Sequence, residues 1–185
     1  MSHPAELLAH WWSRPAPEER SWWAETWDAA LESDRLPTTS LVADLRAAFD
    51  NSNEAELLEE YERLFVGPGR TPCPPYESLW RDGRPRLEQG RVMGSAAAEA
   101  AALYRRLGLR LRPGAHELPD HIAIEWEALA YAIERNADEH ATQLLRQHLA
   151  RWMAGFCAAV ANETTHPFYR ALAQLTPTWT AALAA

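Results

Sequence analysis

Apolar residues recur at helical spacing along most of this chain, and this pattern restricts its fold more than any other feature. The clearest stripe, at intervals of three or four residues, consists of Leu145, Leu149, Trp152, Phe156 and Val160. No segment shows the sustained alternation of period two that is typical of a half-buried strand. We therefore expect an all-α fold, a compact bundle of about eight to ten helices without internal repeats.

Capping residues, prolines and glycines indicate the helix boundaries. Asn53 with Glu56 three residues later predicts a capping box, and Gly108 is expected to end a helix. Pro167 either ends the helix before it or opens the next one. The predicted helices are 4–13, 17–33, one beginning at 38–40, one beginning at 53, 88–107, 119–135, one beginning at 138, and a short last helix near 178.

The length of 185 residues and a hydrophobic content of 47% are sufficient for one domain with a sizeable core. Five of the nine tryptophans lie in the first 27 residues, where we expect them to form core. Pro113 and Gly114 indicate a hinge within residues 112–120. The predicted organisation is an N-terminal segment of residues 1–112, a hinge of residues 113–119 and a C-terminal segment of residues 120–185. Such a hinge permits a monomer or a domain-swapped dimer.

The net charge of −8 disfavours binding to nucleic acid, which needs a basic surface, and suits a basic partner. The chain shows no signal-peptide pattern and no run of about 18 apolar residues, so we expect a cytoplasmic protein without membrane insertion. Cys73 and Cys157 form no C-x-x-C pair. Cys157 is expected to be buried, and Cys73 is the only candidate for a reactive thiol.

One stretch, from Glu60 to Trp80, combines a helix end with a stiff apolar loop. Its sequence is E-Y-E-R-L-F-V-G-P-G-R-T-P-C-P-P-Y-E-S-L-W. Gly67, Pro68 and Gly69 should end the helix, and the later prolines favour an extended loop that carries aromatic residues. A loop of this kind is usually functional or tightly packed.

Few residues suggest catalysis. Asp120 could cap a helix that starts beside it, and His121 and Glu125 share a helix face at a spacing that metals can use, without a third ligand at a matching interval. We find no H-E-x-x-H, G-x-S-x-G or phosphate-binding glycine loop. The sequence therefore predicts neither an enzyme nor a bound metal or cofactor. A small helical metalloenzyme that uses His121 and Glu125 remains an alternative.

Three ordered motifs resemble the TorD/DmsD/NarJ family of chaperones that mature molybdenum-containing respiratory enzymes. They are Y-x-x-L-F-x-G-P-G with P-P-Y-E-S-x-W, then E-x-P-D-H-I at 117–122, then H-L-x-x-W-x-x-x-F with P-F-Y, and together they span residues 57–173. Tyr76 stands where tryptophan is frequent in the family, and Ala123 where glycine is common.

The resemblance implies a cytoplasmic chaperone that binds the twin-arginine leader, or the apo form, of a molybdopterin-dependent oxidoreductase before export. A NarJ-like scaffold for a membrane-bound oxidoreductase that is not exported is the alternative within the family. By position in the motifs, the residues implied in client binding are Tyr61, Leu64, Phe65, Pro75, Tyr76, Asp120 and His121, with Glu77, Ser78 and Trp80 added. Core packing is an equally good explanation for Leu64, Phe65 and Trp80.

Overall fold

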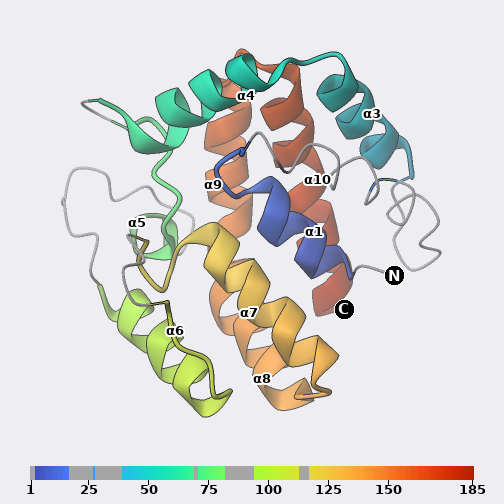
Figure 1. The fold of residues 1–185 in the computed structure, drawn as a ribbon. Coiled ribbons are helices and arrows are strands. Elements are labelled where there is room, and N and C mark those ends of the chain that lie inside the picture. Colours follow the sequence, from blue (N-terminus) through green and yellow to red (C-terminus); the bar gives the residue numbers. More distant parts are fainter. Residues whose placement is uncertain (1–2, 17–26, 28–38, 69–70, 82–93, 113–116) are drawn as a thin grey trace.

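The fold was analysed in a computed structural model, which describes residues 3–16, 27, 39–68, 71–81, 94–112 and 117–185 (Figure 1). The helices are α1 (Pro4–Trp11), α3 (Thr39–Asp50), α4 (Glu54–Tyr61), α5 (Glu77–Trp80), α6 (Ser95–Arg106), α7 (Ile122–Glu134), α8 (Asp138–Gln143), α9 (Ala150–Glu163) and α10 (Pro167–Ala184). Two π-helical segments, η2 (Glu62–Val66) and η5 (Leu144–Leu149), continue α4 and α8. The described residues contain no strand, only an isolated bridge, so the all-α prediction is confirmed.

Helices α9 and α10 pack side by side in the centre of the molecule (Figure 1). Helix α1 lies on α7, and α3 lies on α10, so the beginning of the chain packs directly on its C-terminal half. Helix α4 runs across one end of α9 and α10, whereas α7 and α8 lie toward the other end. Residues 113–116 are outside the described residues, and the hinge stays a prediction.

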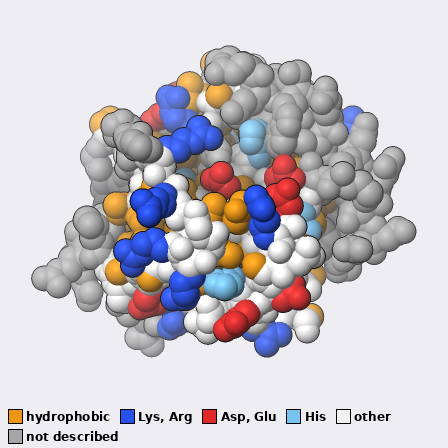
Figure 2. Space-filling view, turned by 60° about the horizontal axis from the view of Figure 1, so that its bottom comes forward, with side chains coloured by type: hydrophobic (Ala, Val, Ile, Leu, Met, Phe, Trp, Pro, Cys, Tyr) orange, Lys and Arg blue, Asp and Glu red, His pale blue; other side chains and the backbone are white. Residues whose placement is uncertain are grey.

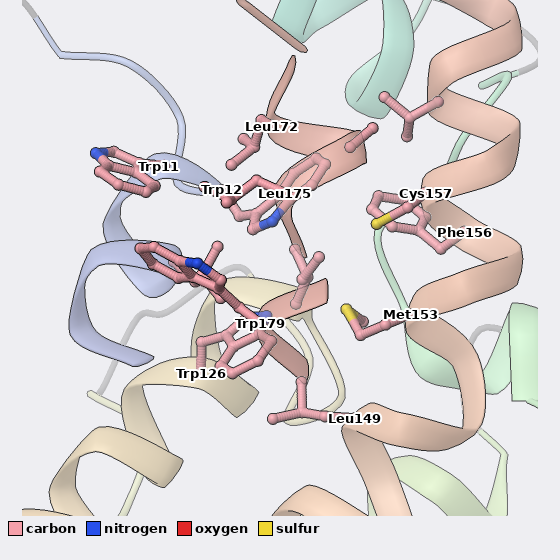
Figure 3. Packing of buried hydrophobic residues seen from close by; sticks show 14 of the residues in the cluster. Trp11, Trp12, Trp126, Leu149, Met153, Phe156, Cys157, Leu172, Leu175 and Trp179 are labelled. Carbon is pink, nitrogen blue, oxygen red and sulfur yellow. The ribbon is translucent and has the colours of Figure 1, made fainter. Parts of the chain in front are cut away.

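Aromatic side chains fill the centre of the core, as Figure 3 shows for α1, α7, α9 and α10. Phe156 of α9 is fully buried, and its ring lies 5.2 Å from that of Trp12 and 5.7 Å from that of Trp80, measured between centroids. Trp11 stacks on Trp27 at 4.6 Å. The prediction that the early tryptophans form core is confirmed for Trp11, Trp12 and Trp27, whereas Trp22 and Trp23 lie outside the described residues.

Several predicted boundaries agree with the structure. The capping box is present, because Asn53 accepts from the Glu56 backbone N–H and Glu56 accepts from that of Asn53. Gly67 and Gly108 follow helix ends with φ of 95° and 76°, the left-handed region that glycine tolerates best. Pro167 opens α10. The predicted helix 17–33 and the start of the predicted helix 88–107 lie largely outside the described residues.

Other boundaries were predicted wrongly. Helix α7 begins at Ile122 rather than near residue 119, because residues before it form the bridge described below. The last helix is not short: α10 has 18 residues and continues through Pro177. Proline removes one helical N–H, but buried threonine hydroxyls donate to other carbonyls nearby, Thr176 to Leu172 O at 2.8 Å and Thr180 to Thr176 O at 2.7 Å. Packing of the surrounding α10 residues in the core stabilises the helix beyond the proline.

Candidate functional site

Two loops that are distant in sequence meet at an isolated antiparallel bridge between Tyr76 and His121. The Glu77 N–H donates to Asp120 O, and the Ile122 N–H donates to Pro75 O, both at 2.9 Å. Residues 74–80 and 117–122 are named the loop junction below. Two of the three sequence motifs therefore form one structural unit.

Asp120 acts as a cap, but not for its own helix. Its Oδ2 accepts from the Ser78 N–H at 3.0 Å and so caps the first turn of α5. The predicted cap of α7 was therefore assigned to the wrong residue: His121 Nδ1 accepts from the Ala123 N–H at 3.2 Å. Burial raises the pKa of Asp120, and hydrogen bonds from Ser78 offset part of that rise.

His121 is neutral in this arrangement, because its Nδ1 accepts a hydrogen bond and therefore carries no proton. Burial lowers the pKa of this side chain, while the nearby Glu117 carboxylate acts in the opposite direction. Glu117 Oε2 lies 3.9 Å from His121 Nε2 and accepts from the Tyr76 hydroxyl at 2.6 Å. The junction therefore brings together the half-buried ring of Tyr76, the buried imidazole of His121 and the exposed carboxylate of Glu117.

A groove of about 1000 Å³ opens beside this junction, between α1 and α7. Its apolar wall consists of Ala9, Ala123, Ile124, Ala130 and Ile133. Its polar lining consists of His3, Glu6, His10, Ser13, Arg14, Tyr61, Arg112, Glu117, His121, Glu127, Tyr131 and Glu134. Burial lowers the pKa of His10 to about 4, which disfavours its charged form near neutral pH. The lining also carries four glutamates and two arginines.

Arginine and acidic side chains are interspersed on the described residues of the face that Figure 2 shows. This face includes the end of the molecule at the bottom of Figure 1, near α6 and α8. Arg105 and Arg106, at the last turn of α6, are exposed. Side chains of both signs occur on this face, whereas carboxylates are in excess in the groove lining.

The ten residues implied in client binding fall into two groups. Tyr61 and His121 line the groove, and Tyr76 reaches Glu117 in its lining. Ser78 is half-buried and provides its N–H to Asp120. The other six side chains are buried and do not line the groove: Leu64, Phe65, Pro75, Glu77, Trp80 and Asp120. A direct role of any of the ten residues in binding stays a prediction.

Sequence reasoning missed a cluster of ionisable residues, named the buried polar cluster, which consists of the buried Glu77, Glu125 and His148 and the partly buried Arg81. His148 Nδ1 lies 2.7 Å from Glu77 Oε2, and Arg81 Nε lies 2.8 Å from Glu77 Oε1. From sequence, His148 is most simply a surface or packing residue. Its position beside Leu149, within an apolar stripe, was the available signal that it is buried.

The structure also separates the two residues of the metalloenzyme alternative. His121 lines the groove, whereas Glu125 points into the buried polar cluster. Among the described residues, the group with metal-ligand potential is Glu77, Glu125 and His148, whose ligand atoms lie within 4.8 Å of one another. The pairing of His121 with Glu125 was therefore the wrong combination.

Neither cysteine is activated. Cys157 is buried, as predicted. Cys73 is fully buried as well, and burial raises the pKa of its thiol to about 12. Such a thiol is not a nucleophile near neutral pH.

Comparison with known proteins identifies the family. The family model described as "Nitrate reductase delta subunit" matches residues 31–158, more than half of the chain. The chain belongs to this family. Both loops of the junction and all four residues of the buried polar cluster lie within the matched range. Among the described residues of this nitrate reductase delta subunit family member, no helix has both the length and the apolar character that crossing a membrane requires.

Curated relatives of this family member carry chaperone names. The Tat proofreading chaperone DmsD of Salmonella typhimurium is 29% identical over 134 residues, which cover 72% of this chain and 63% of the relative. The chaperone protein TorD of Shewanella piezotolerans is 28% identical over 141 residues, covering 75% and 66%. The chain thus spans less than two thirds of the length of these relatives.

A solved structure supports the fold. The crystal structure of a protein from Archaeoglobus fulgidus, described as a redox enzyme maturation protein, superimposes with a TM-score of 0.66 and covers 94% of both chains. Its sequence identity is 24%, so this likeness concerns the helical architecture alone.

Proposed function

We propose that this protein is a maturation chaperone that binds the twin-arginine leader of a molybdopterin-dependent oxidoreductase in the groove between α1 and α7. Membership of the family and the chaperone names of its relatives support this class. Because a leader is bound before export, the chaperone would act in the cytoplasm. It would bind and release its client without catalysing a reaction.

The observation that carries the proposal is the composition of the groove. Four glutamates line it, against two arginines, and one of these arginines, Arg14, is already paired with Glu62 outside the lining at 2.6 Å. A pair of guanidinium groups fits such an excess of carboxylates. The apolar wall of alanines and isoleucines along α1 and α7 can bury the apolar segment that follows the arginines in a leader.

The loop junction lies at one end of this groove, and its motif residues would take part in client binding there. Tyr61 and His121 contribute to the lining, and Tyr76 orients Glu117 through the hydrogen bond from its hydroxyl. The buried motif residues Leu64, Phe65 and Trp80 would act by holding these side chains in place.

The test is binding of a labelled twin-arginine leader peptide, compared with the same peptide in which both arginines are replaced by alanine. We expect Glu127→Gln with Glu134→Gln to weaken binding about three- to tenfold, since each exposed charge contributes about 0.2–1 kcal/mol. Glu139→Gln is the matched control, because Glu139 is exposed but lies on α8 outside the groove. Equal binding of both peptides, or equal effects of the control, would reject the proposal.

A second candidate is assembly of the apoenzyme without a leader, as in NarJ-like members. The match to the nitrate reductase delta subunit model favours it. Capture of an oxidoreductase subunit that lacks a leader, together with no affinity for the leader peptide, would move the function to this candidate.

A further inference from the structure

Two glutamates of the buried polar cluster face each other in the interior, and the basic side chains of the cluster contact only one of them. Glu77, the first residue of α5, and Glu125 of α7 both have 0% exposure. Their nearest ligand atoms, with that of His148, lie within 4.8 Å of one another. Two ionised carboxylates so close together in the interior would repel each other and would each be costly to bury.

The two carboxylates have different neighbouring groups. Glu77 has a basic group at each oxygen, Arg81 Nε at 2.8 Å and His148 Nδ1 at 2.7 Å. Glu125 has the Trp152 indole N–H, which donates to its Oε2 at 3.0 Å. Its Oε1 accepts no hydrogen bond from any donor among the described residues. The ionised form therefore suits Glu77, and a protonated form suits Glu125.

We propose that Glu125 is held as a neutral carboxylic acid that donates a hydrogen bond to Glu77, and that this bond positions α5 at the loop junction. In this form each atom has a matching partner, because Oε2 accepts from Trp152 and the O–H donates to the ionised Glu77. The contacts of Glu77 with Arg81 and His148 complete the attachment of α5 to the interior.

The connection to the groove is short. Tyr76 immediately precedes Glu77, and the Glu77 N–H donates to Asp120 O across the loop junction. Any shift of Glu77 would therefore move Tyr76 and the carboxylate that it orients, Glu117. Glu125 is thus a positioning residue for client binding. This step of the inference rests on the proposed function.

The charges around Glu125 agree with a bound proton. Burial, followed by the charge of Glu77, raises the pKa of Glu125 well above its usual value, and the Trp152 hydrogen bond offsets only some of that rise. Asp120 adds a further negative charge from the loop junction. From α6, Tyr104 adds a neutral phenol and Glu99 is engaged by Arg81 at 2.7 Å. The guanidinium charge of Arg81 is therefore directed at Glu77 and at Glu99 rather than at Glu125.

A divalent metal is the competing explanation, because two carboxylates and one imidazole are a suitable ligand set. The Arg81 guanidinium argues against a metal, since it already occupies one oxygen of Glu77 and would repel a cation. Metal content is therefore one outcome of the test.

The test compares Glu125→Gln, Glu125→Ala and Glu77→Gln in the full chain. Glutamine at 125 keeps both hydrogen bonds, as its amide N–H₂ can donate to Glu77 and its oxygen can accept from Trp152. We expect Glu125→Gln to bind leader peptide within about twofold of wild type, and Glu125→Ala and Glu77→Gln to lose about tenfold or more. Infrared spectroscopy at neutral pH should show a protonated carboxyl band in wild type that is missing in Glu125→Gln.

Three results would overturn the proposal: absence of that band, a defect in Glu125→Gln as large as in Glu125→Ala, or about one equivalent of tightly bound metal in the purified protein. If the wild-type protein binds no leader peptide, the proposed function fails. The infrared band still shows in that case whether Glu125 is protonated. Chemical denaturation of the three variants then separates the positioning effect from a general loss of fold.

Discussion

The aromatic core around Phe156 and the loop junction around Asp120 are both buried, but they are stabilised in different ways. Phe156 contacts the rings of four aromatic residues: Trp12, Phe65, Trp80 and Trp152. Asp120 instead provides two directed acceptors to consecutive N–H groups of α5. The core therefore depends on filled volume, whereas the junction depends on the identity of each donor and acceptor.

This contrast indicates which substitutions each region tolerates. Apolar groups of similar size can replace one another in a core at modest cost. At the junction, a side chain of equal volume but altered hydrogen-bonding capacity leaves a buried partner unsatisfied. The polar groups of the loop junction are thus sensitive to chemistry more than to size.

The largest loss of stability is expected from Phe156→Ala. Removing a fully buried ring that four others contact should lower the free energy of unfolding by about 3–5 kcal/mol, measured by urea denaturation. Val66→Ala, at a side chain with 55% exposure, should change it by no more than about 0.5 kcal/mol. A loss below about 1 kcal/mol for Phe156→Ala would show that the core is not the more volume-dependent region.

A smaller loss of stability is expected at Asp120, and it should depend on whether the new side chain can still accept a hydrogen bond. Asp120→Ala removes the acceptor for the Ser78 N–H and should cost about 1–2 kcal/mol in urea denaturation. Asp120→Asn should cost clearly less, because the amide oxygen still accepts and burial disfavours the charge that the change removes. If Asp120→Ala and Asp120→Asn lower the free energy of unfolding equally, the cap depends on the charge of Asp120 rather than on its hydrogen bond.

The smallest loss of stability near neutral pH is expected at Glu60, whose carboxylate also joins distant segments of the chain by hydrogen bonds. Burial alone would raise the pKa of Glu60, but hydrogen bonds from Arg63, Thr164 and Thr165 lower it to about 2. The pKa of Glu60 is lower in the folded state than in the unfolded state, so its ionised carboxylate stabilises the fold. This contribution to the free energy of unfolding is complete above about pH 4.5 and is lost as pH falls toward 2.

Glu60→Gln should therefore cost about 1 kcal/mol near pH 7 and flatten the decline in stability below about pH 4.5. Glu59→Gln, at a neighbouring and less buried position, is the control. Thermal or urea unfolding across the acid range measures both, and parallel curves for wild type and Glu60→Gln would contradict the assignment.

The helices with a strong apolar stripe were predictable from sequence. The stripe from Leu145 to Val160 indicated the buried face of η5 and α9, and Asn53 with Glu56 indicated the start of α4. These features depend on residues a few positions apart, so local spacing is sufficient to find them. The loop junction was only partly predictable, since the motifs are visible in the sequence but their pairing is not.

The role of Asp120 shows why the prediction was incomplete. A carboxylate before a helix is most simply expected to cap that helix, and only the folded chain brings the Ser78 N–H to it from 42 residues away. In the same way, nothing near His148 or Glu125 in sequence indicates that both face Glu77.

The sequence by itself determined the helical class, several of the helix starts and ends, and the family. Only the tertiary structure decided that motif residues divide into those that line the groove and those that are buried outside its lining. It also decided that ionisable side chains from α5, α7 and η5 share one cluster. Helical periodicity is a local property of the chain, whereas the partner of a buried polar group is set by how distant segments pack against one another.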